Sequence, residues 1–236
     1  AFLGYLINAD KKLGIFINSN REQTITAQWS AYHLANEHNL GDHSFNLIDI
    51  FANIGNTHAE ENFFYLRKDF EAEKKADSFW QKIAASGKKS IGFHIGASRS
   101  NKVWEVEKFR EVIELILEQT NHKVFLFGGY SEITLNSYFS NLQSENFVNL
   151  IGKSKLADLS SLISRVDLFI TNDTGPMHIA AALKKKIINL SLGPVSMWET
   201  SPYVKGAVII QADISCHPCK FSHVCHHQDC HKLITT

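Results

Sequence analysis

Several features that would assign this chain to a familiar class are missing from its 236 residues. Lys and Arg number 24 and so do Asp and Glu, so there is no excess of positive charge for a nucleic-acid backbone. No apolar run reaches the ~20 residues that span a bilayer. No secretory signal peptide is recognisable at the start. We therefore expect no nucleic-acid partner, no transmembrane segment and a cytoplasmic location.

The common nucleotide and hydrolase fingerprints are absent as well. There is no G-x-x-x-x-G-K-[ST] and no G-x-G-x-x-G after a strand, which disfavours a P-loop hydrolase and a typical NAD enzyme. There is also no G-x-S-x-G elbow. A nucleotide bound here would be a leaving group or a carried cofactor.

What the chain does have is a 44% share of hydrophobic residues, enough for a buried core. From Lys88 onward, short apolar runs alternate with stretches whose apolar residues repeat at helical spacing. The predicted strands cover 90–95, 123–127, 147–150, 168–170, 187–191 and 207–211, and the predicted helices cover 109–117, 131–142, 156–166 and 176–183. This alternation predicts an α/β fold with a doubly wound parallel sheet.

Residues 1–87 follow a different pattern, with a predicted strand at 12–17 and helices at 28–38, 45–54 and 69–86. Gly87 lies just past the last helix, and we place a domain boundary there. Residues 1–87 are then the remnant of an N-terminal domain with a linker helix, and 88–236 form a C-terminal domain. Because the chain starts with Ala1 inside an apolar segment, we expect that a start has been removed.

The stretch Asn172–Leu183 has the most chemical content. It predicts a turn between a buried strand and a helix, with Pro176 at the first helical position. Such a junction directs backbone N–H groups and the positive end of a helix dipole at one spot, which suits a phosphate-like anion. Asp173, Thr174 and His178 surround that spot.

Other predicted turns also lie at the carboxyl ends of strands, where doubly wound sheets bind ligands. The turn 96–102 supplies the hydroxyl of Ser98 and the cation of Lys102, and the turn 128–132 supplies Glu132, a carboxylate suited to ribose hydroxyls. Each residue alone has a plainer explanation, such as a solvated charge, a helix cap or a packed histidine. The combination predicts a nucleoside diphosphate site.

All four cysteines lie near the C-terminus, at Cys216, Cys219, Cys225 and Cys230. The C-x2-C pair can present two thiolates to one metal, and two more thiolates can complete a tetrahedral zinc or iron site. The wider spacings fit no standard zinc finger, so packed thiols and two disulfides remain alternatives. We predict a structural metal or a reduced cluster, because nothing indicates export.

Together these motifs resemble glycosyltransferase family 9, the heptosyltransferases of bacterial lipopolysaccharide and glycoprotein synthesis. The resemblance covers about residues 88–236. It rests on Gly96-Ala-x4-Lys102-x-Trp104, Phe127-Gly-Gly-x2-Glu132, Asn149-Leu-Ile-Gly-Lys153, Asn172-Asp-Thr-Gly-Pro-Met-His-Ile-Ala-Ala-Ala-Leu183, Leu192-Gly-Pro194 with Ser201-Pro-Tyr203, and the cysteine tail.

The resemblance implies a GT-B architecture of two Rossmann-like domains, with the nucleotide sugar held mainly by the C-terminal one. The positions that match the family's donor-binding residues are Ser98, Lys102, Glu132, Asp173, Thr174, Gly175 and His178. The implied reaction is inverting transfer of heptose from ADP-heptose to a lipopolysaccharide-core, lipid-linked or protein hydroxyl, without a catalytic metal or other cofactor. Lys102 would stabilise the leaving ADP. The implied location is the inner face of the inner membrane.

Departures from the family leave two alternatives open. No motif in residues 1–87 matches the acceptor-side segment that carries the general base, and Asp10, Asp42 and Asp49 are only available carboxylates. The family also continues past the last cysteine, so we expect an incomplete enzyme. The alternatives are a GT-B transferase that uses another nucleotide sugar, and a noncatalytic nucleotide-sugar-binding or assembly module.

Overall fold

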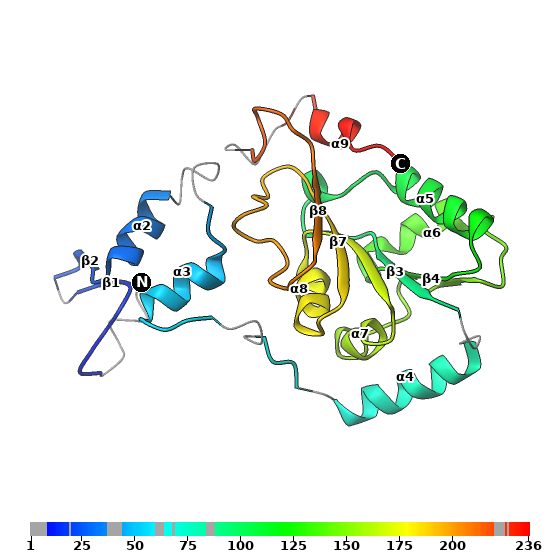
Figure 1. Ribbon diagram of the computed structural model, residues 1–236, viewed down its shortest axis with the longest axis horizontal. Helices are drawn as coiled ribbons and strands as arrows, with labels where there is room; N and C mark the ends of the chain where they lie inside the picture. Colours follow the sequence, from blue (N-terminus) through cyan, green and yellow to red (C-terminus); the bar gives the residue numbers. More distant parts are fainter. Residues whose placement is uncertain are drawn as a thin grey trace.

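The computed structural model describes residues 9–18, 20–36, 44–59, 64–67, 69–83, 88–219, 225 and 227–236. Its larger part is a six-stranded sheet with helices on both faces, and a smaller group of elements precedes it (Figure 1). Of the helices in these ranges, none combines the length and apolar character needed to cross a membrane.

The sheet is parallel throughout, in the order β5-β4-β3-β6-β7-β8. Its strands are β3 (Ser90–His94), β4 (Lys123–Phe127), β5 (Phe147–Asn149), β6 (Leu168–Asn172), β7 (Lys186–Ser191) and β8 (Val208–Gln211). Counted within the domain, the order is 3-2-1-4-5-6, that of the Rossmann fold, and the direction of winding reverses between β3 and β6. The predicted Rossmann-like parallel sheet is confirmed.

Two apolar cores lie on opposite faces of the sheet, because successive strand residues point to opposite sides. In β4, Val124 and Leu126 enter one core, whereas Phe125 and Phe127 enter the other. The first core is covered by α5 (Val106–Gln119), α6 (Asn136–Phe139) and α9 (Asp229–Leu233), and the second by α4 (Phe70–Ile83), α7 (Leu156–Ile163) and α8 (Gly175–Ala182).

Two local predictions need correction. The helix expected over 131–142 is a 3-10 helix, η2 (Tyr130–Leu135), followed by the four residues of α6. The turn is tightened because the Glu132 carboxylate accepts a hydrogen bond from the backbone N–H of Gly129, at 2.6 Å. Pro176 is the second residue of α8, not the first, because the helix already begins at Gly175.

The N-terminal elements are an antiparallel pair, β1 (Ile15–Ile17) and β2 (Gln23–Ile25), with α2 (Gln28–Asn36) and α3 (Leu47–Ile54). The start of α3 contacts the loop between β7 and β8. The backbone N–H of Leu47 donates to the Glu199 carbonyl at 3.0 Å, and the Tyr203 hydroxyl donates to Asp49 at 2.6 Å. The boundary expected near Gly87 falls in 84–87, outside the described residues, and stays a prediction.

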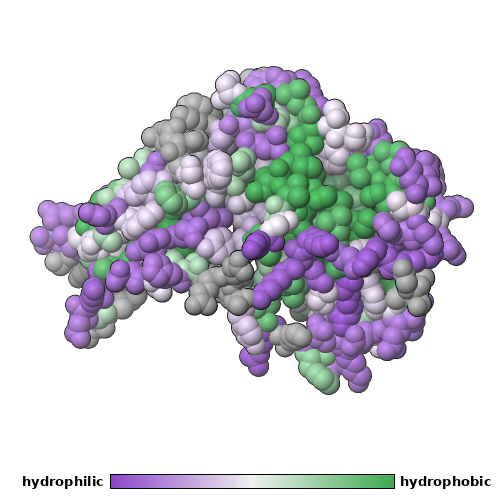
Figure 2. Space-filling view, viewed as in Figure 1, coloured by the Kyte–Doolittle hydropathy of each residue, from purple (hydrophilic) through white to green (hydrophobic). Residues whose placement is uncertain are grey.

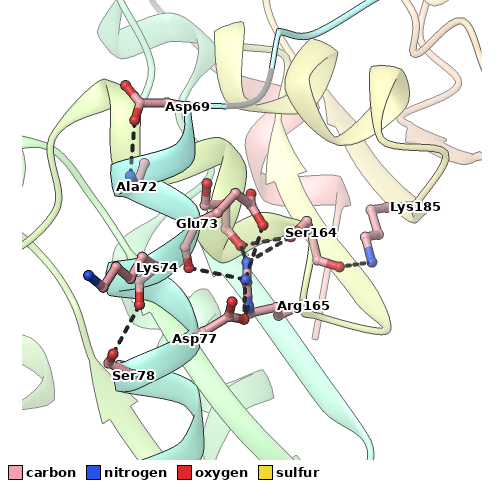
Figure 3. Close-up of polar contacts among 10 residues, drawn as sticks. Asp69, Ala72, Glu73, Lys74, Asp77, Ser78, Ser164, Arg165 and Lys185 are labelled. Carbon is pink, nitrogen blue, oxygen red and sulfur yellow. Dashed lines mark hydrogen bonds and ion pairs between the residues drawn. The ribbon is translucent and has the colours of Figure 1, made fainter.

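Helix α4 is fastened to the sheet domain by Arg165, which follows α7. Figure 3 shows its guanidinium directed at α4, where it donates to the carboxylates of Glu73, at 3.1 Å, and Asp77. It also donates to the backbone carbonyl of Ser161. On the apolar side of α4, Trp80 stacks on Phe125 with ring centroids 4.4 Å apart. Helix α4 therefore packs as part of the second core.

At the β8 edge of the sheet, apolar side chains reach the surface. Strand β8 is an edge strand, and Val208 and Ile210 are 53% and 38% exposed. Figure 2 shows apolar surface over the region where Figure 1 places β7 and β8. An edge strand with exposed apolar side chains can pair with other chains.

One histidine is enclosed at the carboxyl end of β3. His94 is 8% exposed, and its Nδ1 is buried with no hydrogen-bond partner within the described ranges. Burial lowers its pKa to about 4, although the nearby Glu132 charge acts in the opposite direction. His94 is therefore neutral at physiological pH.

We expect Arg165→Ala to lower the free energy of unfolding by about 1–3 kcal/mol, because it removes the charge-assisted hydrogen bonds to the carboxylates of Glu73 and Asp77. Urea denaturation measures this change. The matched control is Arg110→Ala, which removes a partly exposed pair with Glu114 within α5 and should cost about 0.5 kcal/mol or less. Equal losses in the two variants would show that Arg165 does not anchor α4.

The neutral His94 predicts a pH effect on stability. The unfolded chain binds a proton as the pH falls below about 6.5, and folded His94 does not until about pH 4, so stability is lost over this interval. At pH 5 the loss is about 2 kcal/mol, from about 1.4 kcal/mol per pH unit. Urea denaturation at pH 7 and pH 5 should therefore show a smaller loss for His94→Gln than for wild type. The control is His227→Gln, at an exposed histidine. An identical loss of stability in wild type and His94→Gln would show that His94 is not the source of the pH effect.

Candidate nucleotide site

The side chain of Asn172 connects the two strands at which the winding reverses. It is the last residue of β6 and is fully buried. Its amide nitrogen donates to the carbonyls of Ile95, at 3.1 Å, and Gly96, at 3.4 Å, just past β3. Its oxygen accepts from the backbone N–H of Trp104 at 3.1 Å. One amide thus fixes both ends of the turn that contains Lys102.

Lys102 ends the 3-10 helix η1 (Ser100–Lys102) and faces the loop after β6. Its Nζ lies 3.4 Å from Oδ2 of Asp173, a carboxylate whose side chain is only 4% exposed. The hydroxyl of Thr200 donates to the same oxygen at 3.2 Å. An ammonium has three donors, so Lys102 can hold Asp173 and still donate to a ligand. The structure thus brings together two of the predicted site residues.

The start of α8 presents polar atoms without protein partners. Oγ1 of Thr174 and Nδ1 of His178 are buried and have no hydrogen-bond partner in the part of the chain that the structure describes. Burial lowers the pKa of His178, Asp173 opposes this shift, and Lys102 adds to it. Gly175 is exposed, and no atom lies within 4 Å of where its Cβ would be. Buried polar atoms at a helix N-terminus fit an anionic ligand.

Glu132 lies on the other side of Gly96. Its carboxylate accepts from the Gly129 N–H and the Ser131 hydroxyl, at 2.6 and 2.7 Å. A Cβ on Gly96 would come 2.8 Å from Cδ of Glu132, so a larger residue there would displace this carboxylate. Beside this carboxylate is a cavity of about 190 Å³. Its lining residues are His94, Gly128, Gly129, Glu132, Ser154, Lys155, Leu156, Leu159 and Pro176.

Not every predicted residue joins the cluster, and some contributors were missed. Ser98 is exposed in the turn after β3, and the described structure gives it no contact with the other predicted residues. The sequence does not single out His94, although it lies one residue before the end of the predicted strand 90–95, at the same edge of the sheet. Thr200 had no local signal, because it lies 27 residues beyond Asp173 in a long loop.

The cysteines of the C-terminal tail, residues 212–236, are free thiols. Burial raises the pKa of Cys219 and Cys230, and the neighbouring thiols act in the same direction. However, no group of three or more Cys, His, Asp or Glu within the described ranges is arranged to hold a metal ion. His223 and His226 lie outside those ranges. The predicted structural metal at Cys216, Cys219, Cys225 and Cys230 stays a prediction.

The carboxylates considered for a general base are not assigned by the structure. Asp10 is exposed, and Asp42 lies outside the described residues. Asp49 accepts the hydrogen bond from Tyr203. The pKa of Tyr203 is raised to about 12, chiefly by burial of the phenol and secondly by this hydrogen bond. Asp49 is therefore part of the contact between α3 and the loop after β7.

Comparisons with known proteins find similar chains among bacterial heptosyltransferases. Lipooligosaccharide heptosyltransferase 2 of Campylobacter jejuni is 37% identical over 143 residues, which are 58% of this chain and 44% of that protein. The solved structure of Escherichia coli ADP-heptose lipopolysaccharide heptosyltransferase II matches with 26% identity and a TM-score of 0.55, over 66% of this chain and 48% of the other. A glycosyltransferase family 9 structure from Veillonella parvula matches with 22% identity and a TM-score of 0.62, over 72% and 49%.

The chain thus spans less than half the length of these relatives. The structural neighbours are of the GT-B type with a Rossmann-like fold, which confirms the predicted fold class. The family match also extends into the N-terminal residues, where no motif was recognised in the sequence. Because the model of glycosyltransferase family 9 (heptosyltransferase) matches residues 1–231, the chain belongs to that family.

Proposed function

We propose that this chain supplies the donor-binding part of an inverting glycosyltransferase that moves heptose from ADP-heptose to a saccharide hydroxyl. One observation carries the proposal: the Lys102–Asp173 pair and the unpartnered atoms of Thr174 and His178 converge at the start of α8. Membership of a heptosyltransferase family and the names of the relatives favour heptose as the sugar.

The parts of the site correspond to the parts of such a donor. The diphosphate would lie at the start of α8, within reach of Lys102 and the exposed Gly175. The ribose hydroxyls would donate to Glu132. The base would enter the neighbouring cavity, whose apolar wall includes Leu156 and Leu159.

In the proposed reaction, the acceptor oxygen attacks the anomeric carbon from the face opposite the diphosphate, and the bond from that carbon to the β-phosphate oxygen breaks. Negative charge then grows on the leaving ADP. Lys102 and the α8 N-terminus would stabilise it, and Asp173 keeps Lys102 in place beforehand. The acceptor proton would go to a base contributed from outside the cluster described above.

The acceptor proposed here is a lipopolysaccharide-core or lipooligosaccharide saccharide, because the relatives are named for transfer to such molecules. A protein hydroxyl is the second possibility that the family resemblance brings. The proposed location is cytoplasmic, at the inner face of the inner membrane.

Calorimetric titration with ADP, UDP and GDP tests the donor site. We expect ADP to bind most tightly, and Lys102→Ala to weaken ADP binding at least tenfold, about 1.4 kcal/mol, because a charge-assisted contact to the diphosphate is lost. Lys186→Ala is the matched control, since Lys186 is exposed at the amino end of β7, away from the site. Failure of all three nucleotides to bind would refute the proposal, and tighter binding of UDP or GDP would point to another nucleotide sugar.

The metal prediction for the cysteine cluster has its own test. Elemental analysis of protein purified without affinity-tag metal should find zinc or iron, and the Cys219→Ser, Cys230→Ser double variant should lack it, because a tetrahedral site needs its thiolates. Cys219 and Cys230 are chosen because Cys219 belongs to the C-x2-C pair and Cys230 is the last cysteine of the cluster. Wild-type protein with no bound metal and four titratable thiols would show a reduced cluster instead.

A further inference from the structure

The C-terminal tail packs against the turn that carries Lys102. His231, in α9, is 5% exposed, and its Nε2 lies 3.2 Å from the backbone carbonyl oxygen of Asn101. Asn101 directly precedes Lys102. Because a carbonyl can only accept, the contact requires that Nε2 carry the hydrogen. A buried imidazole thus donates to the residue next to the predicted donor-binding cation.

The same carbonyl is enclosed from a second side by Gly193, in the loop after β7. Gly193 has a φ of +61°, and a Cβ there would lie 2.3 Å from the Asn101 oxygen. Its own carbonyl accepts from the backbone N–H of Cys219 at 3.0 Å. The tail, the β7 loop and the Lys102 turn therefore meet at one carbonyl group.

The tail is itself held firmly at this place. Nζ of Lys108 donates to the carbonyls of His231, at 2.6 Å, and Ile234, at 3.0 Å. The indole of Trp104 also donates to the Ile234 carbonyl at 3.0 Å. Cys230 belongs to the same buried core as Trp104. These contacts make α9 a fixed support and not a loose end.

The turn, by contrast, is short, and all of its residues are at least partly exposed. η1 has three residues, none of them buried, and the Arg99 side chain does not cap it. Its backbone bonds are Lys102 N–H to Arg99 and Val103 N–H to Ser100, at 3.1 and 3.2 Å. Asn172 fixes the chain beyond the turn, at Trp104. Contacts from outside therefore decide where Lys102 points.

We propose that His231 is a positioning residue for Lys102: through the Asn101 carbonyl, the cysteine-rich tail holds the turn so that the ammonium faces Asp173 and the donor diphosphate. This inference rests on the proposed donor site. The C-terminal tail then contributes to donor binding as well as to the stability of the domain.

Titration of the chain with ADP tests this role. We expect His231→Ala to weaken binding about tenfold, because the freed turn must be ordered when ADP binds. In His231→Gln an amide N–H can reach the same carbonyl, so affinity should return to within about threefold of wild type. In a Lys102→Ala background, His231→Ala should have little further effect, since the two residues act through one contact.

Two further variants keep the test decisive. Gly193→Ala should weaken ADP binding in the same way, because its Cβ displaces Asn101, and it replaces His231→Ala if that variant does not fold. His227→Ala removes an exposed histidine of the tail that contacts only Asp229 among the ion pairs and hydrogen bonds of the described residues, and affinity should stay as in wild type.

The outcomes separate the two proposals. No ADP binding by wild type would overturn the donor site itself. Weakening by Lys102→Ala with unchanged affinity in His231→Ala and Gly193→Ala would overturn only the role of the tail. Equal losses from His231→Ala with and without Lys102 would also overturn it, because the histidine would then act independently of the cation.

Discussion

The hydrogen bonds of one buried amide, Asn172, determine how the site is arranged. A parallel sheet leaves the carboxyl ends of its strands without further ladder partners, and at the β3–β6 junction this side chain satisfies two carbonyls and one N–H. An aspartate would place a carboxylate oxygen against carbonyl oxygens, and an aliphatic residue would leave three buried backbone groups unpaired, at about 1–3 kcal/mol each. Both donor and acceptor are needed, so only an amide fits.

From that junction the site extends in two directions through contacts between distant segments. Asp173 pairs with Lys102 on one side and accepts from Thr200 on the other. Three residues past Thr200, Tyr203 reaches Asp49 in α3. The predicted donor residues and the N-terminal elements are thus joined through one loop, the one between β7 and β8.

The sequence predicts those features whose signals are local. Buried strands and amphipathic helices show in their apolar spacing, and Asp173, Thr174 and Lys102 stand in turns at predicted strand ends. The η2 helix was mistaken for an α-helix because one side chain, Glu132, bonds back to Gly129 and tightens the turn. Thr200 and His231 could not be found in the same way, since they meet their partners 27 and 130 residues away. Such contacts are fixed by the packing of the whole domain and leave no periodicity.

Unpaired buried atoms alone do not locate a ligand site in this fold. Both polar atoms of Asn189, in the middle of β7, are also buried without a hydrogen-bond partner in the described ranges, yet Asn189 does not line the cavity beside Glu132. Thr174 and His178 differ because their unpaired atoms stand at the N-terminus of an eight-residue helix, next to a cation and an exposed glycine. Unpaired polar atoms that lie beside a positive charge and exposed backbone N–H groups can all bind one anionic ligand. An isolated unpaired polar atom, by contrast, only destabilises the fold.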